Sequence, residues 1–520
     1  MKKEEAAMKV TMFAAIEIAS YEISMKIYAL SQKSMKEITY VRHRIELGKD
    51  AYRLGKISNE RIDELCEVLM DFKRIMKDYG AAEYRACATA VIRELESSSL
   101  LLDRIFVKTG IQIEILSNSE LRYLSYKSIA SQEKDFDKII QKGTAIIDVG
   151  GESIQISLFD KDTLVSTQNI RIGTNRLKER LSNVYEQSGH FAQVVEEIAN
   201  NALKTYRKLY LKDRKVENII LIGDFSPYIS RYVNEERAES HAMSAEEYQH
   251  FYDEMLLKNP QEMLKVLGIP AENEALILTT LVVYRKLIEE TEAKDIWMPA
   301  LNLCDGLTYD YAEKNKILKS AHDFENDIIV AAKNMGKRYQ SNKNHVNVMA
   351  SLALTIFDKT KNLHGMQKRD RLLLQIAVLL HDCGKFISMS RSAECSYNII
   401  MASEIIGLSH AEREMVANIV KYNSMDMISF EEFAQSNALN RKQYIKVCKL
   451  AAILRISNAM DRSHKQKIRE LRVTLKDTQM ILTVDTLEDI TLEQGLLREK
   501  AEFFEDVFGV TPVLRRKKTM

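Results

Sequence analysis

The chain has 520 residues, of which 46% are hydrophobic and 29% are charged, and its 75 Lys and Arg residues nearly balance its 74 Asp and Glu residues. That length predicts about two to four domains with buried cores. The balanced charge argues against the basic surface of a nucleic-acid-binding protein and against the polybasic patch of a membrane-binding one.

Cysteine and hydropathy patterns predict a cytoplasmic protein. The six cysteines include no C-x-x-C pair, which favours free thiols in a reducing compartment over disulfides or a zinc knuckle. Glu4, Glu5 and Glu17 interrupt the apolar N-terminal run, which argues against a signal peptide. No apolar run approaches the about 20 residues that span a bilayer. We therefore expect a protein that binds no nucleic acid and no membrane.

The first expected element is a hairpin within the stretch TMFAAIEIASYEIS, residues 11–24. An apolar strand carries Glu17 near its end, Ala19 and Ser20 make a small-residue turn, and residues 23–27 alternate along a returning strand. Residues 58–79 then predict an amphipathic helix, with Ser58 as its N-cap and Gly80 at its end.

Two further strands complete the first half. They are expected at residues 84–88 and 111–116, and the second of them delivers Ser117 to Glu120 at its end. Alternating strands and helices indicate an α/β domain, in which ligands gather at the carboxyl ends of strands.

The second half begins with a similar hairpin, TAIIDVGGESIQIS, at residues 144–157. Consecutive glycines, Gly150 and Gly151, let the backbone approach a ligand closely, and inward peptide N–H groups with the Ser153 hydroxyl would form a phosphate pocket. Asp148 then lies where a divalent cation bridging to that phosphate needs an oxygen ligand. The alternative is a hairpin turn that happens to carry an acid. Two such hairpins, about 130 residues apart, predict a duplicated fold with a ligand cleft between its halves.

The rest of the chain changes character twice. A helix is expected at 192–211 and a buried strand at 216–222 that ends at Gly223-Asp224. From about residue 310 the periodicity is helical, with a core-like segment at 371–380. The end of the chain predicts two short strands and a last helix, residues 492–508, in a small α+β tail.

Five segments occur in a fixed order: AAIEIAS (14–20), ATAVIRE (88–94), EILSNSELRYL (114–124), IIDVGGES (146–153) and IRIGTNRL (170–177). In this order they resemble motifs of the exopolyphosphatase and guanosine pentaphosphate phosphatase (Ppx/GppA) family. LNLCDGLTYD (301–310) looks like the segment that closes the family's second domain. The resemblance implies an α/β protein with a duplicated actin-like ATPase (ribonuclease H-like) fold in domains 1–130 and 131–309. An all-α HD-type domain over 310–468 and a small α+β domain over 469–520 would follow, and the resemblance also suggests a homodimer.

The resemblance also implies an activity and its residues. The expected reaction is release of terminal phosphate from inorganic polyphosphate, or of the 5′ γ-phosphate of guanosine pentaphosphate, by metal-assisted water attack. Glu120 would be the base for the water, and Mg²⁺ would bind Asp148 and Glu17. The residues expected at the phosphate are Gly150, Gly151, Ser153, Thr89, Arg93, Ser20 and Arg176. The alternatives are a solvated acid at a loop end for Glu120 and a surface arginine for Arg176.

Departures from the family's pattern support a second hypothesis. In the first loop, residues 17–22, Glu17, Ala19, Tyr21 and Glu22 replace an aspartate, a glycine, an asparagine and a serine. In the second hairpin, Glu152, Ile154 and Gln155 depart from the family's pattern. Leu121 replaces a second glutamate of the third segment. Two close carboxylates, Glu17 and Glu22, would repel unless a cation intervenes. The second hypothesis is therefore a module that binds polyphosphate or nucleotide as a sensor without cleaving it.

A third hypothesis concerns the helical region. His381 and Asp382 in HDCGK, with His345 before them and Asp461 after them, look like the H...HD...D set that binds a divalent metal in HD domains. Residues 390–397 contain no further histidine, so we expect one metal at most. Hydrolysis would then belong to this metal site. The alternative is a dimerisation and substrate-channel domain in which His381 and Asp382 only cap and hydrogen-bond. Among the other histidines, His190 and His410 are expected to be ordinary surface residues.

Overall fold

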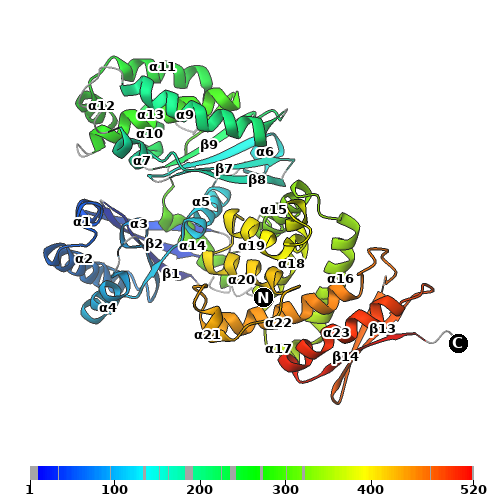
Figure 1. Ribbon diagram of the computed structural model, residues 1–520. Coiled ribbons are helices and arrows are strands. Elements are labelled where there is room, and N and C mark those ends of the chain that lie inside the picture. The colour runs from blue at the N-terminus through cyan, green and yellow to red at the C-terminus, as the bar shows by residue number, and fades with distance from the viewer. Residues whose placement is uncertain are drawn as a thin grey trace, which may run out of the picture. The chain divides into compact units, whose positions relative to one another are not determined.

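The computed structural model describes residues 10–20, 22–32, 34–93, 95, 97–132, 136–151, 153–161, 163–181, 191–212, 214–223, 225–234, 242–269, 273–299, 301–318, 322–468 and 470–517. Tyr21, Glu152, His190 and Asp224, which the sequence had singled out, lie outside these residues. The chain forms two compact units, residues 1–324 and 325–520, which are described separately below (Figure 1).

The first unit begins with a five-stranded sheet of order β3-β2-β1-β4-β5. Its strands are β1 (Thr11–Ile18), β2 (Glu22–Leu30), β3 (Met35–Arg44), β4 (Glu83–Ala88) and β5 (Ile113–Ile115). β1 to β3 form an antiparallel meander, and β4 and β5 continue in parallel to β1. The carboxyl ends of β1, β4 and β5 therefore meet at one edge of the sheet, which is where the first three predicted segments lead.

Residues of β1 alternate between two apolar cores. Ala14, Ile16 and Ile18 pack with residues of α1 (Leu47–Leu54), α2 (Asn59–Asp78) and α4 (Ser98–Thr109), whereas Phe13 and Ala15 pack with α14 (Leu303–Lys314). Ser58 does precede α2, but its hydroxyl donates a hydrogen bond to Asp50 and makes no cap bond to the helix. Gly80 ends that segment with φ +69°, as its position after the helix predicts.

A second sheet in the same unit repeats this plan. Its order is β10-β11-β9-β6-β7-β8, in which β6 to β8 form the meander and β9 and β11 run parallel to β6. The strands are β6 (Thr144–Val149), β7 (Ile154–Asp160), β8 (Thr163–Ile170), β9 (Asn218–Gly223), β10 (Ala242–Ser244) and β11 (Asp295–Trp297). Apart from the extra edge strand β10, both sheets have the same strand order, which agrees with the predicted duplication.

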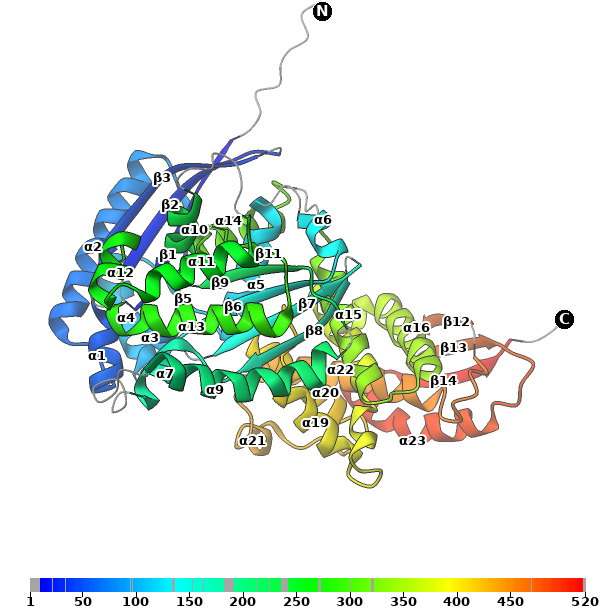
Figure 2. The same ribbon diagram turned by 90° about the horizontal axis from the view of Figure 1, so that it is seen from above.

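Helices cover the second sheet, and Figure 2 shows α9 and α13 lying across it. They share a core with Ala145, Ile147 and Val149 of β6. The helix predicted at 192–211 is present, but only its first part is α-helical. α9 spans Phe191–Tyr206, and a π-helix, Arg207–Leu211, continues it. The other helices that follow β5 in this half are α5 (Asn118–Gln132), α6 (Phe136–Gln141), α7 (Thr174–Arg180), α10 (Ser226–Asn234), α11 (Ala245–Leu256), α12 (Pro260–Leu267) and α13 (Glu274–Thr291).

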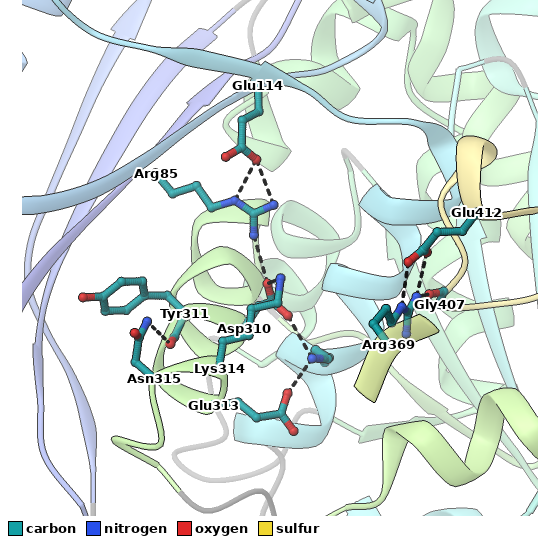
Figure 3. Close-up of polar contacts among 11 residues, drawn as sticks. Arg85, Glu114, Asp310, Tyr311, Glu313, Lys314, Asn315, Arg369, Gly407 and Glu412 are labelled. Atoms are coloured by element: carbon teal, nitrogen blue, oxygen red, sulfur yellow. Dashed lines mark hydrogen bonds and ion pairs between the residues drawn. The ribbon is translucent and has the colours of Figure 1, made fainter. Parts of the chain in front are cut away.

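Two helices, α5 and α14, pack closely against each other (Figure 1). At their crossing, a Cβ added to Gly306 would lie 2.3 Å from the backbone oxygen of Leu124, so only glycine permits this approach. Asp310 of α14 accepts hydrogen bonds from Lys127 of α5 at 2.9 Å and from Arg85 of β4 at 3.0 Å (Figure 3). α14 also spans the predicted domain boundary at residue 310, whereas the two compact units divide after residue 324.

The second unit is helical and ends in a small sheet. Its helices are α15 (Phe324–Arg338), α16 (Lys343–Lys359), α17 (Lys361–His364), α18 (Lys368–Leu380), a 3₁₀ turn (Cys383–Phe386), α19 (Ser392–Ala402), α20 (His410–Lys421), α21 (Phe430–Phe433) and α22 (Arg441–Ala459). They are followed by β12 (Glu470–Lys476), β13 (Gln479–Asp485), α23 (Thr491–Phe508) and β14 (Thr511–Arg516). In the described part of the chain, none of the helices has the length and apolar character needed to cross a membrane.

Sequence reasoning missed β14, which pairs in parallel with β13. Pro512 lies inside it, and a proline normally argues against a strand. The sheet order β12-β13-β14 makes β14 an edge strand, where a missing N–H donor is tolerated.

Candidate functional site

The carboxyl edge of the first sheet brings three predicted segments together. Thr89, which follows β4, donates from its backbone N and from Oγ1 to the carbonyl oxygen of Ile18, at 3.1 and 3.4 Å, so it lies beside the turn at Ala19 and Ser20. Arg93, at the end of α3 (Ala90–Arg93), donates from Nη1 to the carbonyl oxygen of Leu116 at 2.8 Å. The second segment is thus tied to the first loop on one side and to the start of the third segment on the other.

Glu120 lies in the first turn of α5. Its Oε2 accepts hydrogen bonds from the backbone N and the hydroxyl of Ser117, at 3.0 and 2.6 Å, and its own N–H points back to the Ser117 hydroxyl at 3.3 Å. These reciprocal bonds form a capping box. The carboxylate is therefore held in place by Ser117. This differs from the alternative interpretation, in which Glu120 is a freely solvated acid at a loop end.

The first loop carries less unbalanced negative charge than its sequence suggests. Ala19 N–H donates to the carbonyl oxygen of Glu22 at 2.9 Å, closing the turn. The Glu22 carboxylate lies 3.9 Å from a guanidinium nitrogen of Arg42 on β3. Burial raises the pKa of Glu22, and the charge of Arg42 partly opposes this. Arg42, a residue that sequence reasoning did not name, therefore offsets part of the charge of Glu22.

Glu17 is paired in register with Ser24 and belongs to the β1 face that packs on α14. Burial and the nearby charge of Glu17 raise the pKa of the Cys304 thiol on α14 well above its ordinary value. Burial also raises the pKa of Cys87 to about 12, and carboxylates that include Glu17 and Glu120 add to the effect. The charges of Glu17 and Glu120 therefore both affect the Cys87 thiol on β4, which places the two carboxylates near the same edge of the first sheet.

The second loop, which we define as Gly150, Gly151 and Ser153, is closed by the fifth segment. Gly150 N–H donates to the carbonyl oxygen of Ser153, and Arg176 N–H donates to that of Gly151, both at 3.1 Å. A Cβ at Gly151 would lie 2.5 Å from Nδ2 of Asn175. A larger residue at this position would force the Asn175 side chain of the fifth segment to move.

Arg122 joins the third segment to the second loop, and sequence reasoning missed it. Its Nη2 donates to the Ser153 hydroxyl at 2.6 Å, its Nη1 donates to Oε1 of Gln155 at 3.1 Å, and its Nε lies 3.7 Å from Oδ2 of Asp148. The Arg122 side chain is only 6% exposed. An arginine within the apolar run LRYL was the available sequence hint, because a charge there needs a buried partner.

A separate cluster in the second unit contains the predicted HD residues. One ligand atom each of His345, His381 and Asp382 lies within 4.8 Å of the others. Asp461 instead accepts a hydrogen bond from Nδ1 of His345 at 2.8 Å, and its other oxygen accepts from Gln466 N–H at 2.8 Å. Asp461 therefore orients His345 and is not one of the three converging groups.

Both imidazoles of this cluster present Nε2 to the same point. Nδ1 of His381 donates to the carbonyl oxygen of Val378 at 2.7 Å, and Nδ1 of His345 donates to Asp461, so each ring directs its Nε2 atom toward the other. The two Nε2 atoms lie 3.3 Å apart. Burial lowers the pKa of His381 to about 4, which keeps it in the neutral form that binds metals. Burial alone would raise the pKa of Asp382, but His381 and Lys385 lower it.

A groove of about 700 Å³ lies between β8 and α9, and its wall includes Tyr206 and Tyr210. It contains none of the predicted site residues. The catalytic hypothesis therefore rests on the loops at the sheet edges and not on this groove.

Comparisons with known proteins cover nearly the whole chain. Residues 26–315 match the Ppx/GppA phosphatase family, and residues 329–502 match Ppx/GppA phosphatase, domain III. The second match names domain III of that family and does not identify the region as an HD-type domain. Similar curated proteins include guanosine-5′-triphosphate,3′-diphosphate pyrophosphatases of two bacteria. The protein of Photobacterium profundum is 19% identical over 511 residues (94% of this chain, 96% of the relative), and that of Vibrio atlanticus is 17% identical over 483 residues (91% and 92%).

Solved structures share the fold of part of the chain. The Ppx/GppA family member of Aquifex aeolicus superposes with a TM-score of 0.51 at 17% identity, covering 59% of this chain and 99% of that one. An exopolyphosphatase from Cytophaga hutchinsonii gives a TM-score of 0.51 at 14% identity, covering 59% and 100%. At these identities the likeness shows an α/β fold for the N-terminal part.

Proposed function

Because the chain belongs to the Ppx/GppA phosphatase family, we propose that it is a phosphoanhydride hydrolase acting on inorganic polyphosphate or guanosine pentaphosphate. The observation that carries the proposal is the series of four contacts linking the five matching segments. Thr89 bonds to the end of β1 and Arg93 to the start of the third segment. Arg122 bonds to the second loop, and Arg176 closes it. Segments up to about 150 residues apart thus meet around two loops that can hold phosphate.

In the proposed mechanism, Glu120 orients the attacking water and accepts its proton. In the capping box, Ser117 donates two hydrogen bonds to Oε2 of Glu120 and so fixes the carboxylate. Glu120 would act on the water through its other oxygen, Oε1. Backbone N–H groups of the second loop and the side chains of Thr89, Arg93, Ser20 and Arg176 would surround the phosphate chain. Phosphoanhydride cleavage needs positioning and charge neutralisation more than covalent help, and these groups supply both.

A divalent cation, with Mg²⁺ as the proposed ion, would be held by Asp148 and Glu17. Family enzymes generally depend on a divalent metal. Asp148 fits this role because its carboxylate lies near the end of β6, beside the second loop, and hard cations prefer oxygen ligands. When bound, the ion would neutralise charge on the phosphate oxygens.

The test is phosphate release from long-chain polyphosphate and from guanosine pentaphosphate with Mg²⁺. Wild type, Glu120→Gln and a His381→Ala/Asp382→Ala double variant are compared. Loss of at least a hundredfold in Glu120→Gln alone supports catalysis at the sheet edges. Equal rates for wild type and Glu120→Gln reject this mechanism. Saturable binding without any release by wild type would favour the sensor hypothesis, and release from only one of the two ligands would name the substrate.

A second proposal is a single divalent metal in the second unit. The supporting observation is the pair of Nε2 atoms of His345 and His381, 3.3 Å apart, with both Nδ1 atoms committed as donors. A divalent cation beside Asp382 would bind both Nε2 atoms in their neutral acceptor form. Elemental analysis of the purified protein tests it, with the exposed His410→Ala as the matched control for His381→Ala. Absence of a transition metal in wild type rejects it, and loss of phosphate release in the double variant alone would assign hydrolysis to this cluster.

A homodimer and a cytoplasmic location also remain proposals from the family. Light scattering of the purified chain tests the first. Fractionation of cells that express it tests the second.

A further inference from the structure

Strand β12 (Glu470–Lys476) forms an open edge of the small sheet in the second unit (Figure 2). It pairs only with β13 in the order β12-β13-β14. Five of its seven residues are exposed and the other two are half-buried, so helix α16, which also contacts β12, leaves most of the strand accessible. Among the described residues, none outside β13 forms a hydrogen bond with the backbone of β12.

The hairpin of β12 and β13 determines which backbone groups point outward. Lys476 and Gln479 are paired in register across a two-residue turn. Residues that flank such a turn form a hydrogen-bonded pair, and hydrogen-bonded pairs alternate along an antiparallel ladder. The N–H and C=O groups of Lys476 and of every second residue before it therefore face β13. Those of Leu471, Val473 and Leu475 face away from β13 and are open to a further strand.

The two faces of β12 differ in polarity. Leu471, Val473 and Leu475 are paired with buried residues of β13 and share the apolar face of the sheet, although Leu475 is 37% exposed. The opposite face carries the charges of β12, which belong to Glu470, Arg472 and Lys476. In the described part of the chain these three charges have no ion-pair partner. Charges on an edge strand usually oppose pairing with another chain, so their arrangement decides what this edge can bind.

The pattern of β12 is complementary to itself. When two copies pair in antiparallel orientation about Val473, Glu470 of each copy lies opposite Lys476 of the other. Leu471 of each copy then lies opposite Leu475 of the other, and the two Val473 residues face each other. Outward backbone groups thus meet outward backbone groups, and the apolar side chains of both copies share one face.

Other registers are less favourable. Moving one strand by two residues brings Arg472 opposite Arg472 in one direction and opposite Lys476 in the other, and like charges directly opposite destabilise a strand pair. A shift of one residue would place outward groups of one copy opposite groups of the other that already bond to β13. Charge and backbone hydrogen bonding therefore favour the same register.

We propose that β12 is a homodimer interface, in which the β12 edges of two copies pair about a twofold axis at Val473 and join their three-stranded sheets into one. A seven-residue strand pair is small for a permanent interface, so monomer and dimer should exchange and the dimer should dominate at high protein concentration. This proposal names the surface that a homodimer would use, and it does not depend on the proposed catalytic activity.

The first experiment measures association by sedimentation equilibrium. Glu470→Lys and Lys476→Glu each place like charges opposite one another at both ends of the strand pair, and each should weaken dimerisation at least tenfold at low salt. An equal mixture of the two variants should associate within about threefold of wild type, because each supplies the charge that the other lacks. Glu502→Lys, which reverses an exposed charge on α23, is the matched control and should change nothing.

Three outcomes of this experiment overturn the proposal. One is a wild-type chain that stays monomeric at every concentration. Another is association of Glu470→Lys as tight as that of wild type. The third is a mixture of the two charge variants that associates no more tightly than either variant alone.

The second experiment measures hydrogen exchange of the β12 amides at low and high protein concentration. The outward amides of Leu471, Val473 and Leu475 should exchange at least tenfold more slowly when the dimer is populated. Val473→Pro removes an outward N–H only, so it should weaken dimerisation while β13 stays protected. A dimer that forms without added protection of β12 would use another surface and would refute the proposal. Should a charge variant fail to fold, the exchange measurement on wild type decides.

Discussion

Replacing Asp310 by Asn should destabilise the first unit strongly. The Asp310 side chain is 5% exposed and faces three cations: Lys127 at 2.9 Å, Arg85 at 3.0 Å and Lys314 at 2.7 Å (Figure 3). Removing one partner of a buried pair costs about 3–5 kcal/mol, because the remaining charge stays buried. Lys127 keeps a contact with Glu313, and Arg85 keeps one with Glu114, so we expect a loss of about 2–3 kcal/mol.

The pH dependence of this loss has a definite sign. Burial alone would raise the pKa of Asp310, but the charges of Lys127 and Lys314 hold it below its ordinary value. A carboxyl group whose folded-state pKa is depressed contributes its full stability above the unfolded pKa of about 3.9, and loses it as the pH falls through the folded value. The difference between wild type and Asp310→Asn should therefore be constant from about pH 5 to 8 and shrink below about pH 4.

Urea unfolding followed by circular dichroism measures this difference. Asp71→Asn is the control, because Asp71 is an exposed residue of the same unit that pairs with Arg74 and should change stability by less than about 0.5 kcal/mol. Since the chain has two compact units, the transition of the first unit must be followed separately. A loss in Asp310→Asn no larger than in the control would refute the reasoning, as would a difference that grows at acid pH.

Three further predictions follow from other contacts. Gly151→Ala puts a Cβ 2.5 Å from Nδ2 of Asn175 and should lower phosphate release at least tenfold, with a Tm shift of only a few degrees in calorimetry. Glu412→Gln removes the charge and one of the two acceptor oxygens that contact Arg369 at 2.7 Å (Figure 3) and should cost about 1 kcal/mol at pH 7 in urea unfolding. Arg369 opposes the effect of burial and lowers the pKa of Glu412, so the difference should shrink as the pH falls from about 4 through that depressed value. A difference that stays unchanged over this range would count against the prediction. His381→Ala should abolish transition-metal content in the second unit, and retention of the metal would exclude that cluster as its site.

Periodicity and turn chemistry carried most of the sequence prediction. Alternating apolar residues gave both hairpins, and Gly150 with Gly151 marked the second turn before its neighbours were known. Local patterns of this kind depend on residues close in the chain. The end of α9 was not predictable from them, because the helical pattern continues through the π-helix that follows Tyr206. The strand containing Pro512 is acceptable only at the edge of a sheet, which local sequence does not reveal.

The site residues divide in the same way. Asp148 lies near the end of β6 and Glu120 follows β5, so the rule that ligands gather at the carboxyl ends of strands was enough to single them out. Arg122 contacts residues 31 and 33 positions away, and Arg42 balances Glu22 across a strand pair. Such partners are fixed by tertiary packing, which pairwise contacts reveal and periodicity does not.

Helix α5 explains why one segment serves both loops. Successive residues of an α-helix are about 100° apart, so Glu120 and Arg122 point to nearly opposite sides of its first turns. Glu120 is held at the edge of the first sheet by Ser117, and Arg122 reaches the second loop. The position of this helix is set farther along by the close contact of Leu124 with Gly306. A tilt of α5 would therefore move the proposed base Glu120 and Arg122 together, which makes the packing of α5 on α14 a condition for the proposed chemistry as well as for stability.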